Sequence, residues 1–420
     1  MPKIKILFVV AGFYRAGAER FAYEIDKFLN KEKFEISIFC LEKRNDISPL
    51  WKIRYYENLH KELGTKIIYA DNYIVDKREY NLINRILRKI NLKSKITSSW
   101  KKELNSFMNQ YDVIHWMGEY IYINSIDDDI REKSLIHMMT SRFQKRDLYD
   151  KFNHSLHYNF CTPFKEHELK YELEQFENYD FVHVPLLMET NKDDKKWVFT
   201  NSKIKKIGIF TRLNPFKPLD PFFYSFQILL DKLPNTELHI FGNGNPLNYG
   251  IMDMIERLGI EDKIFFRGHS EDITKTVISE EINLSWFHGY NNDRPAGYAG
   301  LDICSTGTPL ICWDFCPKPN NIQDPIIYPH YKNIKEFVSK SIEILTNENE
   351  ANNLSLLQSD DILKDEEEIK DSNIEDEIEK VFSNKVSLSH QLVKKRNFNP
   401  LSKTMITSKI KNEIRSEERR

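Results

Sequence analysis

Short apolar runs alternate with segments of helical spacing along the first half of the chain. Residues 4–10 form an apolar run that ends before Gly12, and residues 17–29 then repeat apolar side chains at helical intervals. Further strand-like runs, separated by segments long enough for helices, lie at 34–41, 66–70, 112–116, 134–138 and 181–185. Because strands that alternate with helices favour a parallel sheet, we expect residues 1–195 to form one Rossmann-like lobe.

The same alternation restarts near Ile204. Strand-like runs in this second half lie at 206–210, 237–241, 263–266, 282–287 and 309–313. The polar residues 189–196 between the two halves are typical of a linker. We therefore predict an α/β fold of two doubly wound, Rossmann-like lobes, 1–195 and 196–350, that face a central cleft. Ligands of such folds bind at the carboxyl ends of the strands.

Charge replaces the apolar pattern after residue 350. Residues 360–379 contain eleven acidic side chains, and residues 394–420 are basic. Such blocks are typical of a solvated helix followed by a disordered tail, and a helix that returns to the first lobe is the alternative. We treat residues 351–420 as a charged C-terminal tail.

Composition narrows the function classes. A chain of 420 residues is long enough for two or three domains, and a formal net charge of −2 creates no field that would attract nucleic acid. The aromatic content of 13% excludes a disordered chain. Five cysteines without CxxC spacing are expected to be reduced, which favours the cytoplasm. No apolar run reaches the ~20 residues of a spanning helix, so we expect no transmembrane segment.

Two cations follow the first strand of the second lobe. Arg212 and Lys217 stand five residues apart in the loop after the run 206–210. At the carboxyl end of a strand, a guanidinium and an ammonium suit a diphosphate, whose growing charge they would neutralise as a nucleotide departs. Two unrelated surface cations are the alternative reading.

Two glycine-containing segments point to the same cleft. Gly242 and Gly244 end a strand, where backbone N–H groups could approach a phosphate or a sugar, and a plain tight turn is the alternative. Gly297 and Tyr298 open a helix whose free N–H groups suit phosphate oxygens. Asp302 in that helix could accept hydrogen bonds from both ribose hydroxyls, or could simply face solvent.

In this order, the segments resemble the C-terminal lobe of glycosyltransferase family 4, which has the GT-B fold. The resemblance covers about residues 204–315, from the Arg-x4-Lys loop through Gly-x-Gly to the helix ahead of Gly-Thr-Pro. The loop 11–20, with Gly-Ala-Glu-Arg at its end, looks like the family's first glycine loop. The resemblance implies that Arg212 and Lys217 bind the donor diphosphate, that Asp302 binds the ribose, and that the loop at Gly17 closes over the phosphates.

This sequence departs from the family pattern at two positions. Family members usually carry two Glu residues separated by seven others, and here Arg294 and Asp302 occupy these positions. Asp293 would replace the first Glu if the loop shifted by one residue. Arg294 would otherwise pair with an acidic sugar or another phosphate.

The family often places a His of the first lobe near the transferred sugar. His115 and His137 both lie at predicted strand ends and are the candidates here. A structural histidine packed in the core is the alternative for each. We expect no metal ligands, because the acidic run 127–129 follows no buried strand.

Residues 77–95 interleave seven basic with six apolar side chains. Such a basic amphipathic face could rest on an anionic bilayer, as similar peripheral glycosyltransferases do with lipid-linked acceptors, or could pack on the core with solvated cations. The chain is then either soluble or peripheral at the inner face of the membrane.

The resemblance implies a glycosyltransferase that moves a sugar from a nucleotide-diphosphate sugar to a glycan or lipid-linked acceptor hydroxyl. It further implies retention of configuration, no metal, no cofactor besides the donor substrate, and no nucleic-acid partner. A role in bacterial surface polysaccharide or glycolipid synthesis fits this reading. The alternatives are a non-catalytic GT-B-like protein that binds a sugar or nucleotide or acts as a scaffold, and an epimerase on the same scaffold.

Overall fold

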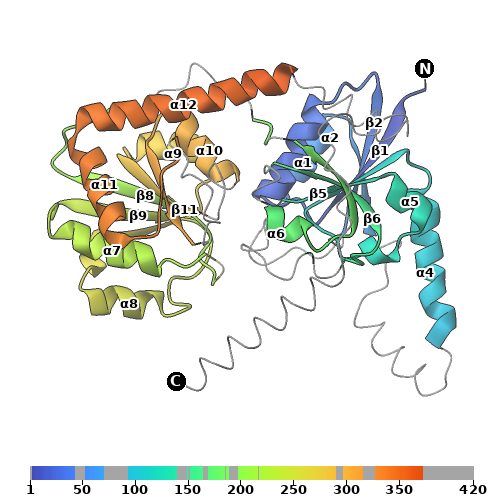
Figure 1. The fold of residues 1–420 in the computed structure, drawn as a ribbon, viewed down its shortest axis with the longest axis horizontal. Helices are drawn as coiled ribbons and strands as arrows, with labels where there is room; N and C mark the ends of the chain where they lie inside the picture. Colours follow the sequence, from blue (N-terminus) through green and yellow to red (C-terminus); the bar gives the residue numbers. More distant parts are fainter. Residues whose placement is uncertain are drawn as a thin grey trace.

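The computed structural model describes residues 2–42, 53–70, 93–139, 149, 152–163, 169–184, 186–188, 197–215, 217–289, 297–315 and 327–371. These residues form two lobes, each built on one parallel sheet with helices packed against it (Figure 1). The predicted α/β fold of two Rossmann-like lobes is confirmed.

The sheet of the first lobe has seven strands in the order β3-β2-β1-β4-β5-β6-β7, and its pairs are parallel. The strands are β1 (Ile4–Val10), β2 (Phe34–Cys40), β3 (Lys66–Tyr69), β4 (Val113–Met117), β5 (Ser134–His137), β6 (His157–Thr162) and β7 (Asn178–His183). The α-helices are α1 (Gly17–Phe28), α2 (Tyr55–Glu62), α4 (Lys93–Met108), α5 (Asp128–Glu132) and α6 (Lys170–Leu173).

The sheet of the second lobe has six strands in the order β10-β9-β8-β11-β12-β13, again with parallel pairs. The strands are β8 (Lys205–Phe210), β9 (Thr236–Phe241), β10 (Ile264–Gly268), β11 (Leu284–Gly289), β12 (Leu310–Asp314) and β13 (His330–Tyr331). The α-helices are α7 (Asp220–Leu230), α8 (Ile251–Leu258), α9 (Ile273–Ser279), α10 (Tyr298–Ser305), α11 (Ile334–Thr346) and α12 (Glu348–Asp371).

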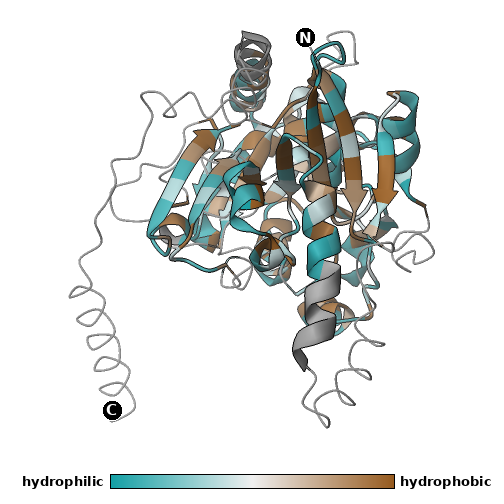
Figure 2. Cartoon of the chain, turned by 90° about the vertical axis from the view of Figure 1, so that its right-hand side faces the viewer, coloured by the Kyte–Doolittle hydropathy of each residue, from teal (hydrophilic) through white to brown (hydrophobic). Residues whose placement is uncertain are grey.

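Both faces of the first sheet are covered, which explains why its central strands are apolar throughout. Ile6, Phe8 and Val10 of β1 pack in one core cluster, and Leu7 and Val9 pack in another on the opposite face. Coloured by hydropathy, the central strands are largely brown, and teal residues lie mostly on the outer elements (Figure 2). The first cluster also contains residues of the second lobe, so the apolar core is continuous between the lobes.

The sequence did not predict two of the strands. Residues of β6 alternate between polar and apolar side chains, and Tyr158, Phe160 and Cys161 are buried while His157 is exposed. Because polar and apolar side chains alternate in β6, the strand forms no continuous apolar run and was not predicted. The second, β13, has only two residues, too few to give a pattern.

The acidic C-terminal segment is helical as far as the structure describes it. α12 ends at Asp371 and extends from the second lobe toward the first (Figure 1). Gln358 anchors this helix, because its buried amide bonds both the N–H and the carbonyl of Leu310 and the carbonyl of Ile327. Residues 372–420 lie outside the described residues, so the return of the tail to the first lobe stays a prediction. No helix among the described residues is long and apolar enough to cross a bilayer.

Candidate functional site

The strand order of each lobe reverses direction at one strand. β1 lies between β2 and β4, and β8 lies between β9 and β11. A crevice forms at the carboxyl ends of such neighbouring strands, because the connections leave toward opposite faces of the sheet. The loops after Val10 and Phe210 therefore line the candidate site.

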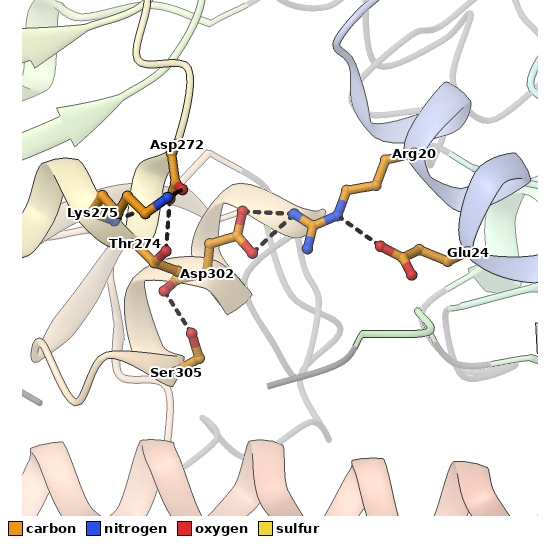
Figure 3. A network of polar contacts seen from close by, with 7 residues as sticks. All are labelled: Arg20, Glu24, Asp272, Thr274, Lys275, Asp302 and Ser305. Atoms are coloured by element: carbon orange, nitrogen blue, oxygen red, sulfur yellow. Dashed lines mark hydrogen bonds and ion pairs between the residues drawn. The ribbon is translucent and has the colours of Figure 1, made fainter. Parts of the chain in front are cut away.

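Arg20 of α1 and Asp302 of α10 connect the two lobes across this site. Arg20 Nη1 donates hydrogen bonds to both carboxylate oxygens of Asp302, at 2.9 and 2.7 Å, and Arg20 Nε lies 3.5 Å from Glu24 Oε1 (Figure 3). Side-chain exposure is 22% for Arg20 and 13% for Asp302, so water screens the pair poorly. Burial raises the pKa of Asp302 above its usual range, although Arg20 opposes this shift.

The start of α10 packs directly against the start of α1. The Arg20 guanidinium lies over the ring of Tyr298, 4.3 Å from its centroid, which is a cation–π contact. A side chain at Gly17 would meet the same ring at 4.0 Å. Gly297, just before the helix, has φ 85°, a conformation that favours glycine. Gly17, Gly297, Tyr298 and Asp302, all proposed from the sequence, thus lie together.

Arg212 and Lys217 both lie in the loop after β8, close enough for the charge of Arg212 to act on Lys217. Burial and the charge of Arg212 lower the pKa of Lys217 to about 8. Lys217 Nζ also lies 6.0 Å from the ring centroid of Phe287. The two cations therefore lie near one another, and their binding of a diphosphate stays a prediction.

Glu19 is a buried carboxyl group in the first turn of α1, beside Arg20. Burial raises the pKa of Glu19 to about 7, while a hydrogen bond from its own backbone N–H and the nearby charge of Arg212 oppose the shift. Glu19 therefore lies close enough to the loop after β8 for the charge of Arg212 to act on it. Glu19 and Arg20 were not predicted as site residues, although both stand in the Gly-Ala-Glu-Arg motif.

Gly242 and Gly244 allow the loop after β9 to lie against the loop after β8. A Cβ atom at Gly242 would meet the carbonyl oxygen of Thr211 at 1.6 Å, and one at Gly244 would meet the Leu213 side chain at 2.6 Å. The N–H of Gly242 donates to the carbonyl of Gly268, at 2.7 Å. Both glycines are thus required for packing, and a contact from this loop to a phosphate or sugar stays a prediction.

Residues 190–356, essentially the whole second lobe, match the family model of the glycosyl transferases group 1. The chain carries a group 1 glycosyltransferase domain. The residues that match this family model thus include Arg212, Lys217 and Asp302. No curated protein matches the sequence.

Solved structures resemble the glycosyltransferase over both of its lobes. The crystal structure of HepE from Anabaena, in complex with UDP and glucose, matches with a TM-score of 0.56 and 11% identity, covering 88% of this chain and 98% of that one. A mutant of TarM from S. aureus, in complex with UDP and α-GlcNAc-glycerol, matches with a TM-score of 0.58 and 12% identity, covering 91% of this chain and 99% of that one. WaaG, a glycosyltransferase involved in lipopolysaccharide biosynthesis, matches with a TM-score of 0.52 and 10% identity, covering 91% of this chain and 100% of that one. At these identities the likeness establishes the GT-B fold.

The two histidine candidates of the glycosyltransferase lie beneath α1. His115 is 2% exposed and His137 is 0% exposed, and the ring of Phe21 in α1 lies 4.0 Å from that of His137. Burial lowers the pKa of His115 to about 3 and that of His137 well below its usual value. Such burial favours the alternative of packed, neutral histidines, and a catalytic role stays a prediction.

Cys161 completes a cluster with these two histidines. This trio is the one group of side chains among the described residues with the spacing of metal ligands. No metal ligand was predicted from the sequence, and Cys161 was missed because its strand, β6, was not predicted.

Two segments for which the sequence predicted a function lie outside the described residues. Asp293 and Arg294 fall in the segment 290–296, and most of the basic segment 77–95 falls in 71–92. The position of the first family Glu and the membrane contact therefore stay predictions.

Proposed function

We propose that this glycosyltransferase moves a sugar from a nucleoside diphosphate sugar to an acceptor hydroxyl, with retention of configuration and without a metal ion. The observation that carries the proposal is the meeting of α1 and α10 at Arg20 and Asp302, beside the cationic loop after β8. A diphosphate needs several positive groups, because it carries its charge on closely spaced oxygens. Arg212, Lys217 and the N-terminus of α10 supply them without a metal ion.

In this proposal the ribose binds at Asp302, where Arg20 now lies. Each carboxylate oxygen has two lone pairs, so Asp302 can accept from a ribose hydroxyl once Arg20 rotates or gives up one of its two bonds. The Arg20 guanidinium would then face the diphosphate. Donor binding and the contact between the lobes are therefore coupled, and closure of the lobes would exclude water from the reacting sugar.

The ligands and roles of the similar solved structures suggest which donor and acceptor to test first. HepE and TarM were both solved with UDP, which makes uridine nucleotides the first to test. TarM also holds a GlcNAc-glycerol, and WaaG is involved in lipopolysaccharide biosynthesis, so a glycan or lipid-linked acceptor is the one we propose. We propose action in the cytoplasm, at the inner face of the membrane, in surface polysaccharide or glycolipid synthesis.

The first test is thermal stability with UDP, GDP, ADP and CMP. A ligand that binds only the folded protein raises the melting temperature, by an amount that grows with its concentration over Kd. We expect one nucleoside diphosphate to raise it, and Arg212→Ala to abolish the effect. Arg257→Ala, which removes an exposed cation of α8 in the same lobe, is the matched control and should leave the shift intact.

Turnover of the matching nucleotide sugar is then measured with and without glycan and glycolipid acceptors. Transfer with the anomeric configuration of the donor, unchanged whether Mg²⁺ and Mn²⁺ are added or left out, is the expected result. Binding without turnover would favour the non-catalytic reading instead. Conversion of the nucleotide sugar into its epimer, without transfer to any acceptor, would favour an epimerase.

A further inference from the structure

Three side chains of the first lobe that commonly ligate metals meet at one point. His115 comes from β4, His137 from β5 and Cys161 from β6, three strands that are neighbours in the sheet. On one side of β5, His137 is paired with Cys161 of β6. On the other side it is paired with Met117 of β4, which lies two residues after His115. Since alternate residues of a strand share a face, the register directs all three side chains to the face covered by α1.

The separations of the three atoms fit a metal site. His137 Nδ1 lies 3.4 Å from His115 Nε2, and Cys161 Sγ lies 3.4 Å from His115 Nε2 and 3.1 Å from His137 Nδ1. A point equidistant from atoms so spaced lies about 1.9 Å from each, close to the ~2.0–2.1 Å of zinc–nitrogen and ~2.3 Å of zinc–sulfur bonds. An ion slightly out of the plane of the three atoms would reach all of them and keep a fourth position open.

We propose that His115, His137 and Cys161 bind one zinc ion within the core of the first lobe. Two imidazoles and one thiolate form the mixed nitrogen and sulfur set that zinc prefers over calcium or magnesium, which take oxygen. On binding, the Cys161 thiol gives its proton to solvent and the sulfur forms a bond to the ion, while the histidines bind as neutral rings. The fourth ligand is a water molecule or another small donor.

The surroundings indicate what this site does. Phe8 and Phe21 pack edge-on against His115 and His137, and all three ligands are buried. Such a site loads most readily as the lobe folds, and the ion would hold β4, β5 and β6 together beneath α1. Among the described residues no group bonds the outer nitrogens, His115 Nδ1 and His137 Nε2. Since such partners usually strengthen a site, we expect weaker binding than in zinc sites with four protein ligands.

The rival state is a trio of hydrogen bonds without an ion. The Cys161 S–H and one imidazole N–H can donate within the cluster, and the same separations suit such bonds. The two states differ in composition, because only one contains a metal. They also differ in what Cys161 contributes, a thiolate ligand in one and a neutral thiol in the other.

The experiment measures the metal content of the full chain produced in zinc-supplemented cells, and again after unfolding and refolding with zinc. We expect close to one zinc per chain in the wild type and a loss of at least tenfold in Cys161→Ala. Cys40→Ala is the matched control, because Cys40 is a buried, free cysteine at the end of β2 in the same sheet. It should retain the zinc of the wild type.

X-ray absorption of the wild-type protein provides a measurement that needs no variant. A zinc spectrum with one sulfur and two imidazole nitrogens in the first shell supports the site, even if Cys161→Ala does not fold. Less than a tenth of an equivalent of zinc after both preparations overturns the proposal in favour of the hydrogen-bonded trio. Zinc without a sulfur ligand, or zinc retained by Cys161→Ala, overturns it equally.

Discussion

Arg20 and Asp302 form the ion pair through which the lobes of this glycosyltransferase contact one another at the candidate donor site. One guanidinium nitrogen of Arg20 donates to both oxygens of Asp302, and the same guanidinium stacks on Tyr298. The carboxylate expected to bind ribose thus already has a partner of opposite charge. The contact that holds the lobes together and the contact that would hold the donor therefore use the same atoms.

A double-mutant cycle tests this pairing. Arg20→Ala leaves a carboxylate that is only 13% exposed without its partner, so we expect it to destabilise the protein by up to about 3 kcal/mol. Asp302→Asn should be harmful for the same reason, and the double variant should lose no more than the worse single variant. Melting temperatures of the four proteins provide the measurement. Strictly additive losses would mean that the two side chains do not interact in solution.

The pair Lys61 and Glu57, in which the lysine is exposed and Glu57 is 16% exposed, is the matched control for this cycle. These side chains form an i,i+4 pair on α2, and Lys61 is 54% exposed. Solvent and salt screen such a pair, so its removal should cost well under about 1 kcal/mol. A loss as large as that of Arg20→Ala would show that the assay does not resolve buried from exposed pairs.

Glu19 should make stability depend on pH. Its carboxyl has a pKa of about 7 in the folded chain against the ordinary 4.5, so the folded state holds its proton more tightly than the unfolded state. Stability therefore falls as the pH rises from about 4.5 to 7, by up to about 3 kcal/mol, and is level above that range. Glu19→Gln removes the titrating group and should flatten this part of the melting-temperature profile.

Glu62→Gln is the control for Glu19, because Glu62 is an exposed carboxyl of α2 in the same lobe. This variant should keep the wild-type decrease between pH 4.5 and 7. If Glu19→Gln keeps the decrease as well, another group causes it.

The sequence predicted the fold better than the site. Central strands such as β1 and β8 are buried on both faces, so their apolar runs stand out along the chain. Arg212 and Lys217 were found because they follow a recognisable strand, and Asp302 because it lies in a recognisable helix. These three residues could be predicted from the pattern of the second lobe alone, without any contact to the first lobe.

Contacts between segments that lie far apart in the chain could not be predicted from the sequence. Arg20 and Asp302 are 282 positions apart, and no local pattern reports which cation reaches which carboxylate. Cys161 was missed for a related reason, because its strand carries polar residues on the half-exposed face and gave no apolar run. The pairing of β5 with β6, which brings Cys161 to His137, is likewise a property of the sheet rather than of either strand.

Gly242 should tolerate no side chain. A Cβ at this position would lie 1.6 Å from the carbonyl oxygen of Thr211, a backbone atom that can move only if the loop after β8 moves. Gly242→Ala should therefore displace the loop that carries Arg212 and cost more than about 3 kcal/mol. Soluble yield and thermal unfolding by circular dichroism measure the loss.

Gly259→Ala provides the comparison for Gly242. Gly259 ends α8 with φ 64°, and nothing lies within 4 Å of a Cβ placed there. This substitution should cost only the ~1–2 kcal/mol of a left-handed non-glycine residue. Equal losses for the two variants would show that the loops after β8 and β9 do not pack as closely as the structure has them.

Lys217 should make nucleotide binding depend on pH in the alkaline range. Its pKa in the free protein is about 8, so below that pH the ammonium is charged and can pair with a diphosphate. A bound anion favours the charged form, so binding is coupled to proton uptake and the affinity falls as the pH rises above about 8. The terminal phosphate has a pKa near ~6 and is already fully ionised there, so its own titration does not produce the decrease. Titration calorimetry between pH 7 and 9.5, with the nucleotide that raises the melting temperature, measures this dependence.

Two variants assign that dependence to Lys217. Lys217→Met should bind about tenfold or more weakly at pH 7, since a hydrogen bond to a charged group contributes about 1.5–3 kcal/mol, and its affinity should not change between pH 7 and 9.5. Lys217→Arg keeps a charge that does not titrate in this range, so its affinity should be equally flat but higher than that of Lys217→Met. A wild-type decrease that persists in both variants would place the titrating group elsewhere, and the loop after β8 would then bind the nucleotide through Arg212 without Lys217.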